Sequence, residues 1–252
     1  MNRTNTEKSP LGKSSSYATS YDSSLLFPIP RKGKRDEIQV PEKLPFSGSD
    51  LWNAYELSWL NNKGKPQIAV AEFFIPCIST NIIESKSFKL YLNSFNQTTY
   101  SSLQEVQATL KKDISAGVEE AVEVNLISVK DFHQAKFQEL TGTNIDDLDI
   151  EIDTYQIKPA FLRASGNPIE ETLCSNLLKS NCLVTGQPDW ASVQIHYHGP
   201  KIHRDALLKY LISYREHNEF HEQCIERIFM DINRMCHPEK LSIYGRYTRR
   251  GG

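Results

Sequence analysis

Apolar and polar positions recur along this chain with two different periods. Residues 52–76 are rich in β-forming side chains, residues 68–75 form the most apolar run, and residues 121–127 alternate like a strand. Between them the spacing is helical. Two helical stripes are predicted there, the first made of Phe88, Leu92 and Phe95 and the second of Leu103, Val106 and Leu110. The first half therefore predicts the order strand, strand, helix, helix, strand.

The second half of the chain repeats this order. Residues 155–162 and 193–198 favour strands, and residues 241–247 alternate as a closing strand. Residues 204–214 and 219–235 are amphipathic with a helical period. The repetition predicts two similar α+β modules with little sequence identity between them.

Composition divides the chain into four segments. Residues 1–45 are rich in Ser, Pro, Lys and Arg, which predicts an extended N-terminal arm, and its basic run at 31–35 is typical of solvated surface. Residues 46–143 then form the first module. Residues 144–153 are strongly acidic and predict a linker or solvated edge. Residues 154–252 form the second module.

Charge and hydropathy exclude several classes of protein. A net charge of −2 gives no electrostatic case for direct binding to nucleic acid. The apolar run 68–71 is too short to cross a membrane, and residues 1–13 lack the apolar segment of a signal peptide. Five cysteines without a CxxC pair predict reduced thiols. We therefore expect a cytoplasmic protein with no membrane partner.

One candidate for covalent chemistry is the pair Cys182 and Asp189, which lie seven residues apart across a Gly-Gln-Pro turn. A thiolate is a strong nucleophile near neutral pH, and a carboxyl group close to it can deliver a proton. The alternatives are a cysteine that only packs in a core and an aspartate that bonds its own backbone in the turn. The residues alone leave both interpretations open.

A second candidate is the segment 84–91, Glu-Ser-Lys-Ser-Phe-Lys-Leu-Tyr, at a predicted helix start. Lys86 and Lys89 are spaced to share one helical face. Hydroxyls, backbone N–H groups and cations at a helix start suit a phosphate, although solvated lysines are the alternative. The chain has neither GxGxxG nor GxxxxGK[ST], so a dinucleotide would bind without a Rossmann or Walker loop.

Three further features have weaker signals. His221 and Glu222 are adjacent on a predicted helix, about 100° apart, and could present different groups to one ligand. His196 and His198 share a strand face, but no matching spacing supports a zinc site. The basic end at 246–252 is either a tail or an arm that clamps an anion.

Taken together, these motifs resemble a known family. The segments 84–91 and 182–189, the His221-Glu222 pair and the Arg-Arg-Gly-Gly end are similar to the long, two-module 7-cyano-7-deazaguanine reductases, the nitrile reductases of queuosine biosynthesis in tRNA modification. The resemblance implies two tandem tunnelling-fold (T-fold) modules, each an antiparallel sheet backed by two helices. It also implies a homodimer with active sites at module interfaces.

The resemblance further implies a reaction and a role for each matched residue. NADPH would reduce 7-cyano-7-deazaguanine to 7-aminomethyl-7-deazaguanine by two hydride transfers, without a metal. Cys182 would attack the nitrile carbon to form a covalent thioimide, and Asp189 would protonate its nitrogen. The implied substrate-binding residues are Ile83, Glu84, Ser85, His221 and Glu222. The implied cofactor-binding residues are Ser85, Lys86, Arg250 and Gly251.

Two other functions are weighed against this one. A pterin or purine hydrolase similar to GTP cyclohydrolase on the same fold would need a zinc site of Cys and His, which the spacing does not supply. A purine-binding module without catalysis would need Glu222 but not the Cys182 and Asp189 pair.

Overall fold

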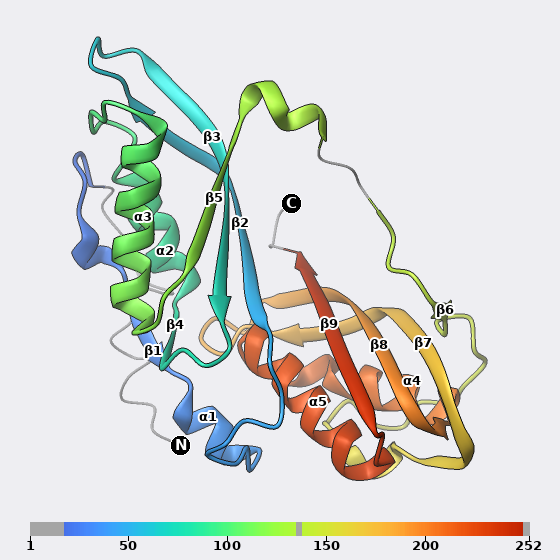
Figure 1. Cartoon of the computed structure of the whole chain (residues 1–252). Helices are drawn as coiled ribbons and strands as arrows, with labels where there is room; N and C mark the ends of the chain where they lie inside the picture. The colour runs from blue at the N-terminus through green and yellow to red at the C-terminus, as the bar shows by residue number, and fades with distance from the viewer. Residues whose placement is uncertain (1–17, 135–137, 249–252) are drawn as a thin grey trace. The chain divides into compact units, whose positions relative to one another are not determined.

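The computed structural model describes residues 18–134 and 138–248 of the chain. It divides into two compact units, Met1–Phe137 and Gln138–Gly252, shown in Figure 1. Each unit has its own hydrophobic core. No helix within the described ranges is long and apolar enough to cross a membrane.

The first unit contains a three-stranded antiparallel sheet in the order β2-β3-β5. Its strands are β2 (Ser49–Leu60), β3 (Pro66–Pro76) and β5 (Glu123–Ser128). Two helices cover one face of this sheet, α2 (Ser85–Asn93) and α3 (Leu103–Val118), as Figure 1 shows. The two predicted helical stripes are confirmed, because Phe88, Val106 and Leu110 are buried in the core between helices and sheet.

The N-terminal region forms short elements that pack on this unit, namely η2 (Ser23–Leu25), β1 (Pro28–Pro30) and α1 (Lys32–Glu37). Strand β1 pairs with β4 (Asn81–Ile83), and Ile29 is buried. The prediction of a solvated basic run is wrong for Arg31, which is 2% exposed and forms an ion pair with Asp50. Lys32 and Lys34 instead pair with acidic side chains of α1.

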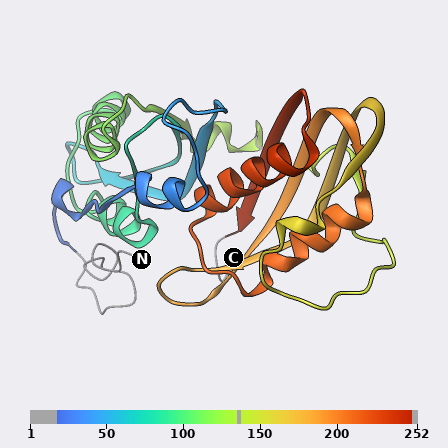
Figure 2. The same cartoon turned by 90° about the horizontal axis from the view of Figure 1, so that it is seen from below.

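The second unit contains a four-stranded sheet in the order β6-β7-β8-β9. Its strands are β6 (Thr143–Asn144), β7 (Ala164–Asn181), β8 (Pro188–Ile202) and β9 (Lys240–Thr248). Strands β7, β8 and β9 are antiparallel, and the short β6 runs parallel to β7. Helices α4 (Arg204–Ile212) and α5 (His221–Cys236) cover one face of the sheet, as Figure 2 shows.

Three short 3-10 helices complete the described chain, η3 (Val129–Gln134), η4 (Pro159–Phe161) and η5 (Ser213–Glu216). The strand predicted over residues 155–162 is wrong, because that region is a loop with η4. The long strand β7 begins only at Ala164 and was not predicted. Its register shifts twice, between Ser165 and Pro168 and between Ser175 and Leu178, and such bulges interrupt the alternation that identifies a strand.

The two units share more than their element order. In the first unit Tyr91 on α2 donates a hydrogen bond of 2.7 Å to Asp113 on α3. In the second, Tyr210 on α4 donates one of 2.7 Å to Asp231 on α5. All four side chains are buried. The same buried contact therefore joins the helix pair of each unit, and the predicted α+β class with antiparallel sheets is confirmed.

Candidate active site

Cys182 lies at the start of the loop that joins β7 to β8. The two strands end in the pair Asn181 and Pro188. The Cys182 N–H donates to the Gln187 carbonyl at 2.8 Å, and the Gly186 N–H donates to the Cys182 carbonyl at 3.0 Å. Gly186 has φ +66°, a left-handed conformation that glycine adopts without strain. The loop thus fixes the backbone of Cys182 at both polar groups, and its side chain is buried.

Asp189 is the second residue of β8 and is 3% exposed. It therefore lies in a strand rather than in the turn that its sequence context suggested. Its Oδ2 lies 3.3 Å from Nε2 of His221, the first residue of α5. The His221 ring stacks on Tyr247 of β9, with centroids 4.0 Å apart and planes 6° from parallel. The structure therefore brings Asp189 and His221 together.

Glu222 follows His221 in the first turn of α5 and is partly exposed. An acidic side chain in the first turn also interacts favourably with the helix dipole. Consecutive helical positions point about 100° apart, so His221 can meet Asp189 while Glu222 points elsewhere. This arrangement permits two different contacts to one ligand.

Residues 217–219, which the sequence reasoning did not single out, bind the end of β7. The Asn181 N–H donates to the His217 carbonyl at 2.8 Å, and the Glu219 N–H donates to the Asn181 carbonyl at 3.0 Å. The Asn218 side chain donates to the Cys182 carbonyl at 3.3 Å. The backbone next to Cys182 is therefore held from a second side.

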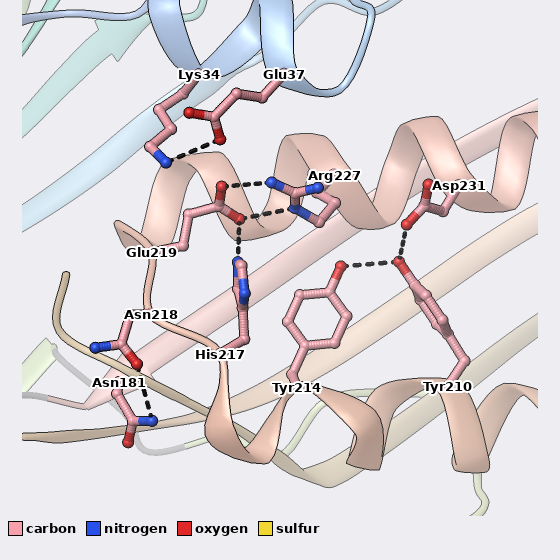
Figure 3. Close-up of polar contacts among 10 residues, drawn as sticks. All are labelled: Lys34, Glu37, Asn181, Tyr210, Tyr214, His217, Asn218, Glu219, Arg227 and Asp231. Atoms are coloured by element: carbon pink, nitrogen blue, oxygen red, sulfur yellow. Dashed lines mark hydrogen bonds and ion pairs between the residues drawn. The ribbon is translucent and has the colours of Figure 1, made fainter. Parts of the chain in front are cut away.

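The Glu219 carboxylate is 1% exposed and makes three contacts, drawn in Figure 3. Arg227 of α5 donates to it twice, at 2.9 Å and 2.7 Å, and His217 Nε2 lies 3.1 Å away. Burial alone would raise the pKa of Glu219, but the hydrogen bonds from Arg227 and His217 outweigh it and lower the pKa to about 2. Glu219 is thus a buried carboxylate that stays ionised at neutral pH.

This lowered pKa predicts how stability depends on pH. A carboxyl group with a depressed folded-state pKa stabilises the fold above its ordinary pKa of 4.5 and loses that contribution as pH falls towards about 2. We expect the free energy of unfolding of the wild type to fall by on the order of 3 kcal/mol more than that of Glu219→Gln across this window. Urea unfolding at a series of pH values measures the difference. Equal pH dependence in both proteins would contradict the assigned ionisation.

The residues from Ile83 to Lys86 belong to the first unit, at the junction of β4 and α2. Glu84 is buried and caps α2: its carboxylate accepts from the Lys86 N–H at 2.7 Å and from the Ser87 N–H at 2.8 Å. The expectation that these backbone groups are available to a phosphate is therefore wrong for those two N–H groups. Ser85 is exposed and Lys86 is partly exposed. Of the groups expected to meet a phosphate there, the Ser85 hydroxyl donates to Oε1 of the Glu84 carboxylate at 3.4 Å.

The remaining candidates are placed as follows. Arg250 and Gly251 lie outside the described residues. His196 contacts Thr172 at 2.9 Å and Glu170 at 3.5 Å, while His198 lies 3.1 Å from Glu239. Within the described part of the chain, no cluster of three or more His, Cys, Asp or Glu side chains could hold a metal ion.

Fold and site together define a two-unit α+β protein with a cysteine and a carboxylate on one hairpin. Two family models match it: "nitrile reductase, 7-cyano-7-deazaguanine-reductase N-term" over residues 17–126 and "QueF-like protein" over residues 188–252. The chain belongs to the 7-cyano-7-deazaguanine reductase family, as its motifs predicted.

Similar proteins in other organisms carry this family's name. A protein of Burkholderia lata called NADPH-dependent 7-cyano-7-deazaguanine reductase is 58% identical, over 98% of this chain and 91% of its own. Proteins with the same name from Cupriavidus necator and Ralstonia nicotianae are 61% and 59% identical, each over 98% of this chain and 90% of their own.

Proposed function

We propose that this chain catalyses the NADPH-dependent reduction of 7-cyano-7-deazaguanine to 7-aminomethyl-7-deazaguanine in queuosine biosynthesis. The observation that carries the proposal is 58% to 61% identity, over nearly the whole chain, to reductases of that name. Because those relatives are named as reductases, we prefer this reaction to the alternative of a hydrolase similar to GTP cyclohydrolase. We place the reaction in the cytoplasm, on the free base and without direct contact to nucleic acid.

The chemistry begins with Cys182. Its thiolate adds to the nitrile carbon, so an S–C bond forms and one C–N π bond becomes an electron pair on nitrogen. Asp189 donates the proton that this nitrogen requires, and a neutral thioimide results. A nitrile carbon accepts hydride poorly, whereas the imine-like carbon of the thioimide accepts it readily. The backbone bonds at Cys182 and the burial of Asp189 support these roles.

Substrate recognition is assigned to the residues that match the family's motifs. Glu222 accepts from the amino and ring N–H groups of the deazaguanine, which is a charge-assisted contact, and His221 lies beside it. Ile83, Glu84 and Ser85 complete the substrate contacts. Because Glu84 already accepts from two backbone N–H groups, it meets the substrate through its remaining acceptor capacity.

The cofactor contacts are assigned to Ser85 and Lys86 at the start of α2 and to Arg250 and Gly251 at the C-terminal end. NADPH supplies the hydrides when it is bound. The exposure of Ser85 and the partial exposure of Lys86 at the start of α2 support the first pair. The second pair rests on the motif alone.

We also propose that the chain contains two tandem T-fold modules and forms a homodimer. In this division residues 1–45 are an arm, 46–143 the first module, 144–153 a linker and 154–252 the second module. The repeated order of strands and helices supports it, as does the buried tyrosine–aspartate contact that both helix pairs share.

The proposed reaction predicts its stoichiometry. Reduction of a nitrile to a primary amine consumes two hydrides, so two NADPH should be oxidised per nitrile. NADPH absorbance should fall only when the nitrile is present, and mass spectrometry should find the amine as product. One NADPH per nitrile would contradict full reduction to the amine. No nitrile-dependent oxidation at all would refute the function.

A further inference from the structure

We infer that Glu219 is a positioning residue for the Cys182 thiol. It acts through the segment 217–219, and the inference rests on the proposed function of Cys182 as nucleophile. Neither the motifs nor the names of related proteins assign Glu219 a role. The argument comes from what its buried carboxylate connects.

The first step is the link between the segment 217–219 and the nucleophile. Two backbone hydrogen bonds join Asn181 to His217 and Glu219, and one side-chain bond joins Asn218 to the Cys182 carbonyl. Asn181 and Asn218 also form a parallel β-bridge, and their side chains meet at 3.4 Å. A displacement of this segment therefore displaces the backbone that carries the thiol.

The second step is the link between Glu219 and a rigid support. Arg227, which donates both bonds to the carboxylate, lies on α5. That helix is fixed by core side chains of the second unit, including Cys224, Ile228 and Ile232. Figure 3 shows the Glu219 carboxylate between Arg227 and His217. Glu219 therefore ties the loop before α5, and through it Cys182, to the core.

The third step separates positioning from simple stabilisation. Asp231 is also a buried carboxylate of this unit and lies one turn of α5 beyond Arg227. It accepts a hydrogen bond from Tyr210, so it joins α5 to α4. Glu219 joins α5 to the end of β7. Loss of either carboxylate costs stability, but only loss of Glu219 is expected to disturb the nucleophile.

The fourth step predicts which kinetic quantity changes. His221 and Glu222, the proposed substrate contacts, lie on α5 itself and remain anchored by its core face. The hairpin end that carries Cys182 loses part of its support when Glu219 is replaced. The maximal rate of adduct formation should therefore fall, while the substrate concentration at half-maximal rate changes little.

The test measures covalent adduct formation by rapid mixing and intact mass, with 7-cyano-7-deazaguanine and no NADPH, over a range of substrate concentrations. For Glu219→Gln we expect the maximal rate to fall about tenfold or more, with half-saturation within about threefold of wild type. The matched control Asp231→Asn should keep a rate near wild type despite a lower melting temperature. A wild-type rate in Glu219→Gln, or an equal loss in both variants, would overturn the inference.

A second variant covers the case in which Glu219→Gln does not fold. Asn218 is exposed, and Asn218→Ala removes the bond to the Cys182 carbonyl without leaving a buried charge. Its maximal rate should fall in the same direction by a smaller factor, and an unchanged rate would count against the inference. A wild-type protein that forms no adduct would instead overturn the proposed function of Cys182, and this inference with it.

Discussion

Replacement of Cys182 by alanine should abolish the covalent adduct and nitrile-dependent NADPH oxidation. The variant lacks the sulfur that adds to the nitrile, and without that addition the carbon remains a poor hydride acceptor. Other thiols of this unit are poor substitutes. Burial raises the pKa of Cys174 and Cys224, and it raises the pKa of Cys236 to about 11. A raised pKa leaves less of the reactive thiolate at neutral pH.

The measurement is intact mass after incubation with the nitrile and without cofactor. Cys236→Ala is the matched control, because Cys236 is also a buried free thiol of the second unit, at the end of α5. It should form the adduct at full stoichiometry. An adduct that survives Cys182→Ala would remove Cys182 from the mechanism. Melting curves of both variants show that any loss is chemical rather than structural.

Periodicity predicted the elements whose pattern is local. The face of α3 that carries Val106 and Leu110 is buried because an amphipathic helix places its apolar stripe against a sheet. Strand β7 has no such continuous pattern, because its two bulges shift which residues face the core. The contact between Tyr210 and Asp231 could not be predicted from the sequence either, since it depends on how α4 and α5 pack against one another.

The residues of the candidate site also differ in how far the sequence alone could predict them. Cys182 and Asp189 were predicted as a pair from their spacing, and they lie on the two sides of the loop that joins β7 to β8. Their roles in catalysis stay a prediction. The capping role of Glu84 had a signal, namely an acidic side chain just before a predicted helix. Glu219 had no such signal in the sequence. Its contacts are with Arg227, which lies within α5, and with Asn181, which ends a strand far away in the sequence.

Replacement of Asp189 by asparagine should slow adduct formation by about 10²- to 10⁴-fold, the range expected for loss of a general acid. Addition of the thiolate places charge on the nitrile nitrogen, and an amide cannot supply the proton that neutralises it. Asparagine keeps the size of the side chain in its buried place on β8. The rate should therefore fall without a large loss of stability.

Rate and binding can be separated in one set of proteins. Adduct formation is followed by mass in Asp189→Asn and in the control Asp146→Asn, a carboxylate that accepts from Ser175 and Asn176 near β6. The control should react at the wild-type rate. Substrate affinity is measured by calorimetry in a Cys182→Ala background with and without Asp189→Asn, where no covalent bond forms, and it should change little.

His221 provides the competing explanation, because its Nε2 lies 3.3 Å from the Asp189 carboxylate and an imidazolium could deliver the proton instead. In that case Asp189→Asn would keep a substantial rate and His221→Asn would lose it. If Asp189 is the donor, His221→Asn weakens binding more than it slows the bond-forming step, whereas Asp189→Asn does the reverse. If Asp189→Asn and His221→Asn have opposite effects on affinity and on maximal rate, the comparison therefore identifies which of these two contacting side chains donates the proton.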